Sequence, residues 1–216
     1  MSLHAAFPQA TAASHRHDPF LTPMALPTAA PSRQLKHTRR IAVQVFSRGD
    51  GLWEVDAELA DTKTRDAPLA AGVRLAGEPI HDMLLRLVVD EHFNILESGA
   101  QSRAVPYPGH CDDHGDAYGR LVGLNLLKGF RHEVLKRLRG VLGCTHLTEL
   151  SQVLPTAVLQ GFVGEVIDTR GADPDGEQPF QIDRCHALRA DGPTVKTFYP
   201  RWYRPSGSTT APVSDT

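Results

Sequence analysis

The sequence predicts an α+β fold, in which an antiparallel sheet of about four strands is packed by two main helices. Three observations lead to this fold class. Segments with the alternating pattern of strands fill the first half of the chain beyond residue 36, segments with helical spacing fill the second half, and short turns connect consecutive strands. Strands and helices that are segregated along a chain are typical of α+β proteins with an antiparallel sheet.

Four segments predict the strands of this sheet. The first covers residues 41–46 (IAVQVF), and the turn sequence RGDG leads from it to the second strand at residues 53–59, in which apolar and acidic residues alternate. The third strand covers residues 81–90, and the fourth runs from Phe93 toward Gln101. A period of two residues places the apolar side chains of a strand on one face.

Apolar residues spaced three and four apart predict a first helix from Leu121 to Leu138. A second helix starts near Cys144 and reaches Val158. Pro155 lies inside this segment and should kink or split the helix, because an interior proline removes a hydrogen bond and clashes with the preceding turn. Residues 191–192 (DG) predict a short turn or hairpin near the end of the ordered chain.

Composition divides the chain into one domain and two tails. Residues 1–35 are rich in Ala, Pro, Ser and Thr without periodicity, so we expect a disordered arm. Residues 36–204 contain every predicted strand and helix and should form a single α+β domain. Residues 205–216 are expected to be a disordered tail for the same reason as the arm.

Charge and hydropathy exclude several classes of protein. A formal net charge of -2 gives no overall attraction to nucleic acid or anionic lipid. No segment approaches the run of about 18 apolar residues that a membrane-spanning helix needs. Prolines interrupt the N-terminal region, which lacks the continuous apolar stretch of a secretory signal. We therefore expect a cytoplasmic protein that binds neither nucleic acid nor a membrane.

The three cysteines, Cys111, Cys144 and Cys185, are too few for a disulfide framework and should remain thiols in the cytoplasm. Each has a histidine within two positions, namely His110, His146 and His186, respectively. Three such pairs for three cysteines indicate metal or thiol chemistry.

Cys144 and His146 lie in the stretch GCTHLTEL, where the second helix is predicted to start. A helix N-terminus stabilises a thiolate through free N–H groups and the helix dipole. Three interpretations remain open at this point: the pair binds a metal, Cys144 is a reactive thiol, or both residues cap and pack the helix start.

Two further positions are candidate ligands. His81 opens the third strand with the parity of its apolar residues, so its side chain is either a ligand or a hydrogen-bonded core histidine. Cys111 lies in the loop YPGHCDDH, where prolines could hold it in place as a ligand, or where it is an ordinary polar connection. Cys185 and His186 leave the same choice open.

The charged stretch DTKTRD at residues 61–66 follows the predicted second strand. Alternating charges in a loop are usually solvated. If this loop folds over the metal-binding end of the sheet, Asp61 and Lys63 become candidates for handling a substrate.

Zinc is the simplest metal for a site built from Cys and His side chains, with three protein ligands for catalysis or four for a structural site. The sequence has no CxxC pair, so it does not follow the pattern of a zinc finger or ribbon. Iron, alone or in an iron–sulfur cluster, is the alternative because thiolates also bind iron.

The chain resembles the bacterial family called domain of unknown function 2889 over about residues 36 to 203. The segments that carry the resemblance are DGLWEVDAELADTK, GEPIHDMLLRLVVD, PYPGHCDD, RLVGLNLLKGF, GCTHLTEL and DRCHALRADGPTVKTFYPRWY. This resemblance implies no particular biochemical activity.

A more distant resemblance is to iron–sulfur scaffold proteins of the NifU-like and sulfur-acceptor type. In their order of elements, His81 and Asp82 stand where those scaffolds have a Cys-Gly-Asp, Cys111 stands at their loop cysteine, and Cys144 with His146 stands at their last cysteine pair. The first cysteine is replaced by His81, and Cys144 and His146 are not adjacent. The resemblance therefore implies a NifU-like architecture and a similarly placed metal centre rather than cluster assembly.

The leading hypothesis is a mononuclear zinc centre built from His81, Cys111, Cys144 and His146. Asp82 would orient a metal-bound histidine or add a ligand. A water retained on zinc would make the protein a hydrolase or lyase that acts on a small-molecule substrate.

The second hypothesis is a non-enzymatic carrier of iron–sulfur clusters or persulfide sulfur, in which Cys111 or Cys144 accepts sulfur or iron from a sulfur-transfer partner protein. A third is a structural zinc domain that binds another protein.

Overall fold

The structure of the protein is a computed structural model that describes residues 26–113, 115–171 and 176–205. The chain divides into two units, Met1–Leu35 and Lys36–Thr216. Most of the predicted disordered arm and nearly all of the predicted tail lie outside the described residues. Residues 26–35 have no helix or strand.

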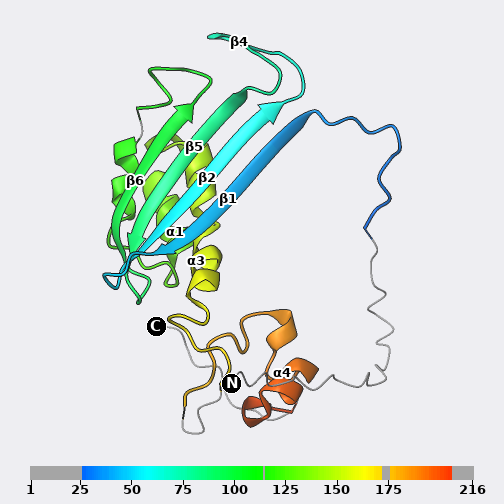
Figure 1. Ribbon diagram of the computed structural model, residues 1–216, viewed down its shortest axis with the longest axis vertical. Coiled ribbons are helices and arrows are strands. Elements are labelled where there is room, and N and C mark those ends of the chain that lie inside the picture. The colour runs from blue at the N-terminus through cyan, green and yellow to red at the C-terminus, as the bar shows by residue number, and fades with distance from the viewer. Residues whose placement is uncertain (1–25, 114, 172–175, 206–216) are drawn as a thin grey trace, which may run out of the picture. The chain divides into compact units, whose positions relative to one another are not determined.

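The second unit contains the predicted antiparallel sheet (Figure 1). Its four strands follow the order β1-β2-β5-β6, so that consecutive long strands are neighbours. This arrangement confirms the α+β class. The strands are β1 (His37–Ser47), β2 (Trp53–Lys63), β5 (Pro79–Val89) and β6 (Ile95–Ala104).

The first two strands form the predicted hairpin, and the N–H of Arg48 donates to the carbonyl of Leu52 across its turn. Both strands are longer than their apolar residues indicated. β1 begins at His37 rather than Ile41, and β2 continues to Lys63. The expectation that Asp61 lies in a solvated loop is therefore wrong, because the ladder of backbone hydrogen bonds continues where the side chains become polar.

A second, smaller sheet was not predicted from the sequence. It is the two-stranded hairpin of β3 (Ala67–Leu69) and β4 (Gly72–Arg74), which is inserted between β2 and β5. The side chain of Arg74 ties it to the end of β6 by donating to the carbonyl of Val105 over 3.1 Å.

The predicted first helix is shorter than its periodicity suggested, since α1 covers only Phe130–Leu138. The preceding residues follow a 3₁₀ helix at Gly115–Leu121 and then an irregular segment. Gly123 and Gly129 have φ angles of 81° and 62°, the left-handed region that interrupts a helix. The N–H of Gly123 donates instead to the carbonyl of Ile95 in β6, so this segment joins the sheet.

The predicted second helix is split, as expected from its proline. It forms α2 (Thr145–Ser151) and α3 (Leu154–Phe162), with Pro155 in the first turn of α3, where its missing N–H costs nothing. A short 3₁₀ helix at Gly140–Leu142 precedes α2.

Of the short turn or hairpin predicted near residues 191–192, the structure has the turn and not the hairpin. The chain turns there and enters α4 (Pro193–Phe198), because Pro193 suits the first turn of a helix and has no N–H for a strand ladder. Two 3₁₀ helices, His186–Leu188 and Pro200–Trp202, flank α4. This C-terminal segment has its own small core, which consists of Ile182, Ala190 and Val195.

The main core lies between one face of the large sheet and α1, α2 and α3 (Figure 1). Helix α2 packs on β2 and β5, and α3 packs on β1. Gly161 in α3 lies close to β1: a methyl group at this position would lie 2.8 Å from a methyl carbon of Val45. Among the described residues, no helix has the length and apolar character needed to cross a bilayer.

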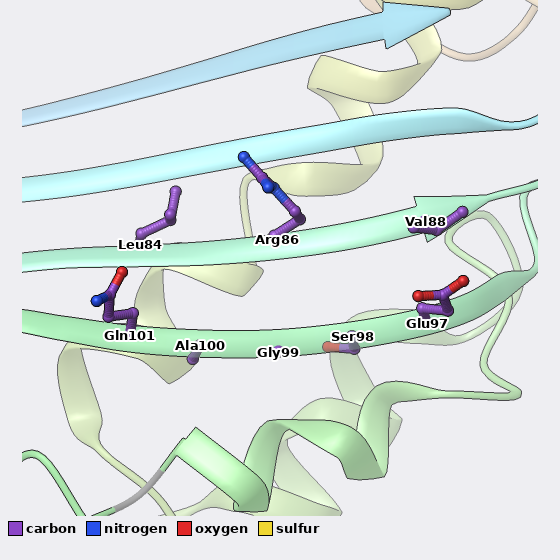
Figure 2. Close-up of a pocket in the computed structure, with 8 residues that line it drawn as sticks. All are labelled: Leu84, Arg86, Val88, Glu97, Ser98, Gly99, Ala100 and Gln101. Carbon is purple, nitrogen blue, oxygen red and sulfur yellow. The ribbon is translucent and has the colours of Figure 1, made fainter. Parts of the chain in front are cut away.

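The opposite face of β5 and β6 carries an open groove of about 370 Å³. Figure 2 shows that its walls are side chains of β5 and β6 and that its floor at Gly99 is bare backbone. Arg86, one of the residues that line it, donates two hydrogen bonds of 2.6 Å to Asp56 of β2. No cysteine or histidine lines this groove.

Candidate metal centre

The helix-covered face of the sheet becomes polar at one end. Along β2 the buried side chains alternate through Leu59, and the next one on the same face is Asp61. Arg39 of β1 pairs with Asp61 on one side and His81 of β5 pairs with it on the other. Three neighbouring strands therefore place charged or titratable side chains together at positions where apolar ones stand elsewhere.

Asp61 is 3% exposed, and its carboxylate accepts four hydrogen bonds. Its Oδ1 accepts from His37 Nε2 at 3.0 Å and from Arg39 Nε at 2.9 Å. Its Oδ2 accepts from Arg39 Nη2 at 2.8 Å and from His81 Nδ1 at 3.0 Å. An ionised carboxylate only accepts, so the histidine nitrogens that face it carry protons. These contacts occupy all of its usual acceptor positions.

Helix α2 adds His146 to this cluster. Its Nε2 lies 4.0 Å from Asp61 Oδ2, and its ring stacks on His81 with centroids 3.8 Å apart and an interplanar angle of 34°. Ligand atoms of Asp61, His81 and His146 all lie within 4.8 Å of one another. Among the residues that the structure describes, these three form the group with the spacing of a metal site.

The protonation states suit metal binding. Burial lowers the pKa of His81, although the hydrogen bond that its ring donates to Asp61 opposes this. Burial and the charge of His81 also lower the pKa of His146. Burial alone would raise the pKa of Asp61, but hydrogen bonds and charge from Arg39 and His81 outweigh it and lower the pKa to about 2. At neutral pH the group is thus one carboxylate and two neutral imidazoles, the forms that bind metals.

Cys144 precedes helix α2 and lies beside His146, with 3.9 Å between Cys144 Sγ and His146 Nδ1. Its side chain makes no capping hydrogen bond; its carbonyl instead accepts the first helical bond from the N–H of Thr148. Of the interpretation that Cys144 caps or packs the helix start, the packing is therefore confirmed, since Cys144 packs against the main core, and the side-chain cap is not. The thiol therefore lies near Nδ1 of the His146 ring, whereas Asp61 lies near Nε2.

Tyr118 fixes the position where α2 begins. Its hydroxyl, which is fully buried, donates to the carbonyl of Cys144 over 2.8 Å and accepts from the N–H of Cys144 over 3.1 Å. The hydroxyl also lies 3.0 Å from Thr148 Oγ1. The placement of His146 over the sheet thus depends on a tyrosine 28 residues earlier in the chain.

One more carboxylate reaches the cluster from the solvent side. Glu149 of α2 accepts a 2.7 Å hydrogen bond from Nη1 of Arg39, while the Nε and Nη2 atoms of the same guanidinium hold Asp61. These hydrogen bonds raise the pKa of Arg39, so it stays charged. One cation is shared by two carboxylates.

The other predicted site residues lie elsewhere. Cys111 is in the loop after β6, where its N–H donates to the carbonyl of Tyr107, and Cys185 is exposed in the C-terminal segment. The group of potential ligands found among the described residues includes no cysteine. Asp82 points to the opposite face of the sheet and pairs with Arg103 over 2.8 Å. The carboxylate beside His81 is Asp61 instead.

Sequence reasoning placed Asp61 and Lys63 in a loop and did not select His37 or Arg39. The alternation of β1 nonetheless indicated their position, because His37 and Arg39 have the same parity as the partly buried Val43 and Val45. Lys63 likewise has the parity of Asp61, one step closer to the end of β2. Extending the alternation of each strand past its apolar residues would have placed these side chains on one face.

Two of the three distances between the donor atoms lie near those of a zinc site. Zinc bound at 2.0–2.1 Å with tetrahedral angles would hold its donor atoms roughly 3.3 Å apart. The distances of Asp61 Oδ2 from His81 Nδ1 and His146 Nε2, 3.0 Å and 4.0 Å, lie on either side of this value. A metal between these atoms would replace the proton that His81 shares with Asp61.

Comparison with known proteins identifies the family but no activity. No curated protein and no solved structure matches the chain, so the resemblance to NifU-like scaffolds stays a prediction. The family model described as Protein of unknown function (DUF2889) matches residues 37–160, more than half of the chain, and the protein therefore belongs to that family.

Proposed function

We propose that this protein binds a divalent transition metal, with zinc as the first choice, through Asp61, His81 and His146. The observation that carries the proposal is a carboxylate and two neutral imidazoles with ligand atoms within 4.8 Å of one another, on a face of the sheet that is otherwise apolar. Buried polar groups cost stability unless they are satisfied. Such a cluster at core positions is therefore expected where it has a function.

The ligand set favours a catalytic rather than a structural zinc site. Two histidines and one carboxylate leave a coordination position for water or substrate, whereas closed structural sites use four protein ligands, most of them cysteines. Zinc would act there as a Lewis acid on a bound water or on a substrate carbonyl. The corresponding activity is that of a hydrolase or lyase for small molecules, with Lys63 at the end of β2 as a candidate contact for the substrate.

The same three ligands also suit iron. A facial set of two histidines and one carboxylate binds mononuclear Fe(II) in non-haem oxygenases. Metal analysis of freshly purified protein under anaerobic conditions distinguishes the two metals.

The alternative of a sulfur or iron–sulfur carrier depends on Cys111 and Cys144. Neither thiol belongs to the group of potential ligands described above. Brown protein that contains acid-labile sulfide would favour the carrier and contradict the proposed centre.

The decisive experiment measures the metal content and zinc affinity of protein purified without a histidine tag. The wild type is expected to bind zinc stoichiometrically, and His81→Gln and His146→Gln are expected to lose it. His132→Gln, at an exposed position of α1, is the matched control and should behave like the wild type. Cys144→Ser should also keep the metal, which distinguishes this centre from one that includes the thiol. Absence of zinc and iron binding by the wild type would contradict the proposal.

A further inference from the structure

We infer that Glu149 is a fourth protein ligand of this centre, and that Arg39 holds it away from the metal position until a metal binds. The inference rests on the proposed function and adds a residue that the group of three ligands does not include. Water or substrate would then take a fifth coordination position, which catalytic zinc sites allow. In the metal-free protein, Arg39 is then the cation that pairs with the carboxylates of Asp61 and Glu149.

The first step is the position of Glu149 on α2. It follows His146 by three residues, and residues three apart lie on the same side of a helix with Cβ atoms about 5–6 Å apart. The two residues belong to the sequence HLTE, so one helical turn offers an imidazole and a carboxylate to the same region.

The second step is the contact with Arg39. The guanidinium donates through Nη1 to Glu149 and through Nη2 to Asp61 Oδ2, over 2.7 Å and 2.8 Å. Asp61 Oδ2 is also the atom that faces both histidines. The carboxylate of Glu149 is therefore separated from a proposed ligand atom by the width of one guanidinium group.

The third step is the balance of charge. Asp61 and Glu149 contribute two carboxylates, and Arg39, which hydrogen-bonds to both of them, contributes one guanidinium cation. A dication bound to both carboxylates would be neutralised by them. The same dication next to Arg39 in its present position would be repelled by the guanidinium. Metal binding therefore favours release of Arg39 and a shift of Glu149 toward the metal.

The fourth step is that Glu149 is free to move. Its side chain is 52% exposed, whereas that of Asp61 is 4% exposed. The side chain of Arg39 is 31% exposed and can extend toward solvent. Exposed ion pairs contribute little to stability, so exchanging the contact between Arg39 and Glu149 for a metal bond costs little.

The test is a comparison of Glu149→Gln with Glu97→Gln, an exposed position on the opposite face of the sheet. Zinc affinity is measured by competition with a chelator, and the visible spectrum of the Co(II)-loaded protein reports the ligands. Glu149→Gln should weaken zinc binding at least ~10-fold and change the Co(II) spectrum, because ligands and the groups that support them typically contribute this much. Glu97→Gln should leave both unchanged.

The outcomes separate this inference from the proposed function. If the wild type binds zinc and Glu149→Gln binds it with the same affinity and the same Co(II) spectrum, Glu149 is not a ligand and the three-residue centre stands. A weaker affinity with an unchanged Co(II) spectrum would show that Glu149 acts by charge alone and would also overturn the inference. If the wild type binds no metal, both proposals fail. Thermal unfolding of the metal-free variants should match the wild type, since the substituted side chains are exposed.

Discussion

The two ends of the helix-covered face of the sheet are built differently from the same strands. At one end, Trp53 and Phe93 pack on Phe162 of α3, with ring centroids 4.8 Å and 4.7 Å apart. At the other end, the same alternation of β2 places Asp61 under α2, where a network of hydrogen bonds replaces apolar contacts. The backbone pattern of the sheet therefore extends beyond its apolar core, and the side chains that could bind a metal lie at the polar end.

The polar end is also the more costly one to build. A buried ion pair must recover the free energy lost when both charges leave water, and a well-packed apolar pair often does as well or better. Asp61 meets this requirement through two hydrogen bonds from Arg39 and one from each of two histidines. A network with so many partners is sensitive to the loss of any one of them, while the apolar end responds mainly to changes in volume.

The largest expected effect is that of Asp61→Ala. This variant leaves Arg39 and His81 without their buried partner, so the free energy of unfolding should fall by about 3–5 kcal/mol. The matched control is Asp56→Ala on the same strand. Asp56 also accepts two hydrogen bonds from an arginine, Arg86, but it lies on the opposite face and the Arg86 side chain is 53% exposed. Urea denaturation of the metal-free proteins measures both.

The control should lose less than about 1 kcal/mol, as expected for an exposed pair. If Asp61→Ala and Asp56→Ala lowered the free energy of unfolding equally, the hydrogen bonds at the polar end of the face would stabilise the protein no more than those on the exposed side of the sheet. That result would break the comparison between the two ends.

The next effect is the dependence of stability on pH that Asp61 gives to the polar end. The pKa of Asp61 is lowered from 3.8 to about 2, so the folded protein binds this proton less readily than the unfolded chain. Its contribution is fully present above the unfolded pKa and is lost as the pH falls through the folded pKa, between about pH 5 and pH 2. The amount is on the order of 2 kcal/mol.

The measurement compares the wild type with Asp61→Asn in urea denaturation at several pH values. The difference between their free energies of unfolding should be constant above about pH 5 and should shrink by about 2 kcal/mol toward pH 2, because the variant lacks the titrating carboxyl group. A difference that does not change with pH would show that the environment of Asp61 does not lower its pKa.

The fold could be predicted from the sequence wherever apolar residues repeat at a regular spacing. The β1–β2 hairpin and the split at Pro155 followed from local patterns and were confirmed. The helix predicted from Leu121 begins only at Phe130, because the apolar residues near Gly123 pack on the sheet from an irregular segment. Buried apolar side chains can have the same spacing in the sequence whether they lie on a helix or on an irregular segment, and only the backbone conformation distinguishes the two.

The candidate site was predicted in part. The parity of His81 and the start of a helix near His146 brought two of the three proposed ligands into consideration. Asp61 was misplaced because an alternating charge pattern was taken for a loop, although it also fits the last residues of a strand. Arg39 was missed because its contacts join residues 22 and 110 positions away in the chain, a separation that no local pattern reports.

The smallest expected effect tests the apolar end. Gly161→Ala would place a methyl group 2.8–3.1 Å from three side-chain carbons of Val45, a stiff residue on β1 that cannot turn away. Overpacking of this kind should lower the free energy of unfolding by about 1–2 kcal/mol. Gly99→Ala in β6 is the control, because its methyl group meets no atom within 4 Å and alanine suits a strand slightly better than glycine. The effect should come from volume alone, so Gly161→Ala should lose the same free energy at pH 7 and pH 2, unlike Asp61→Asn. A loss that depends on pH would mean that α3 and the polar end are coupled, and the two ends could then no longer be treated as independent.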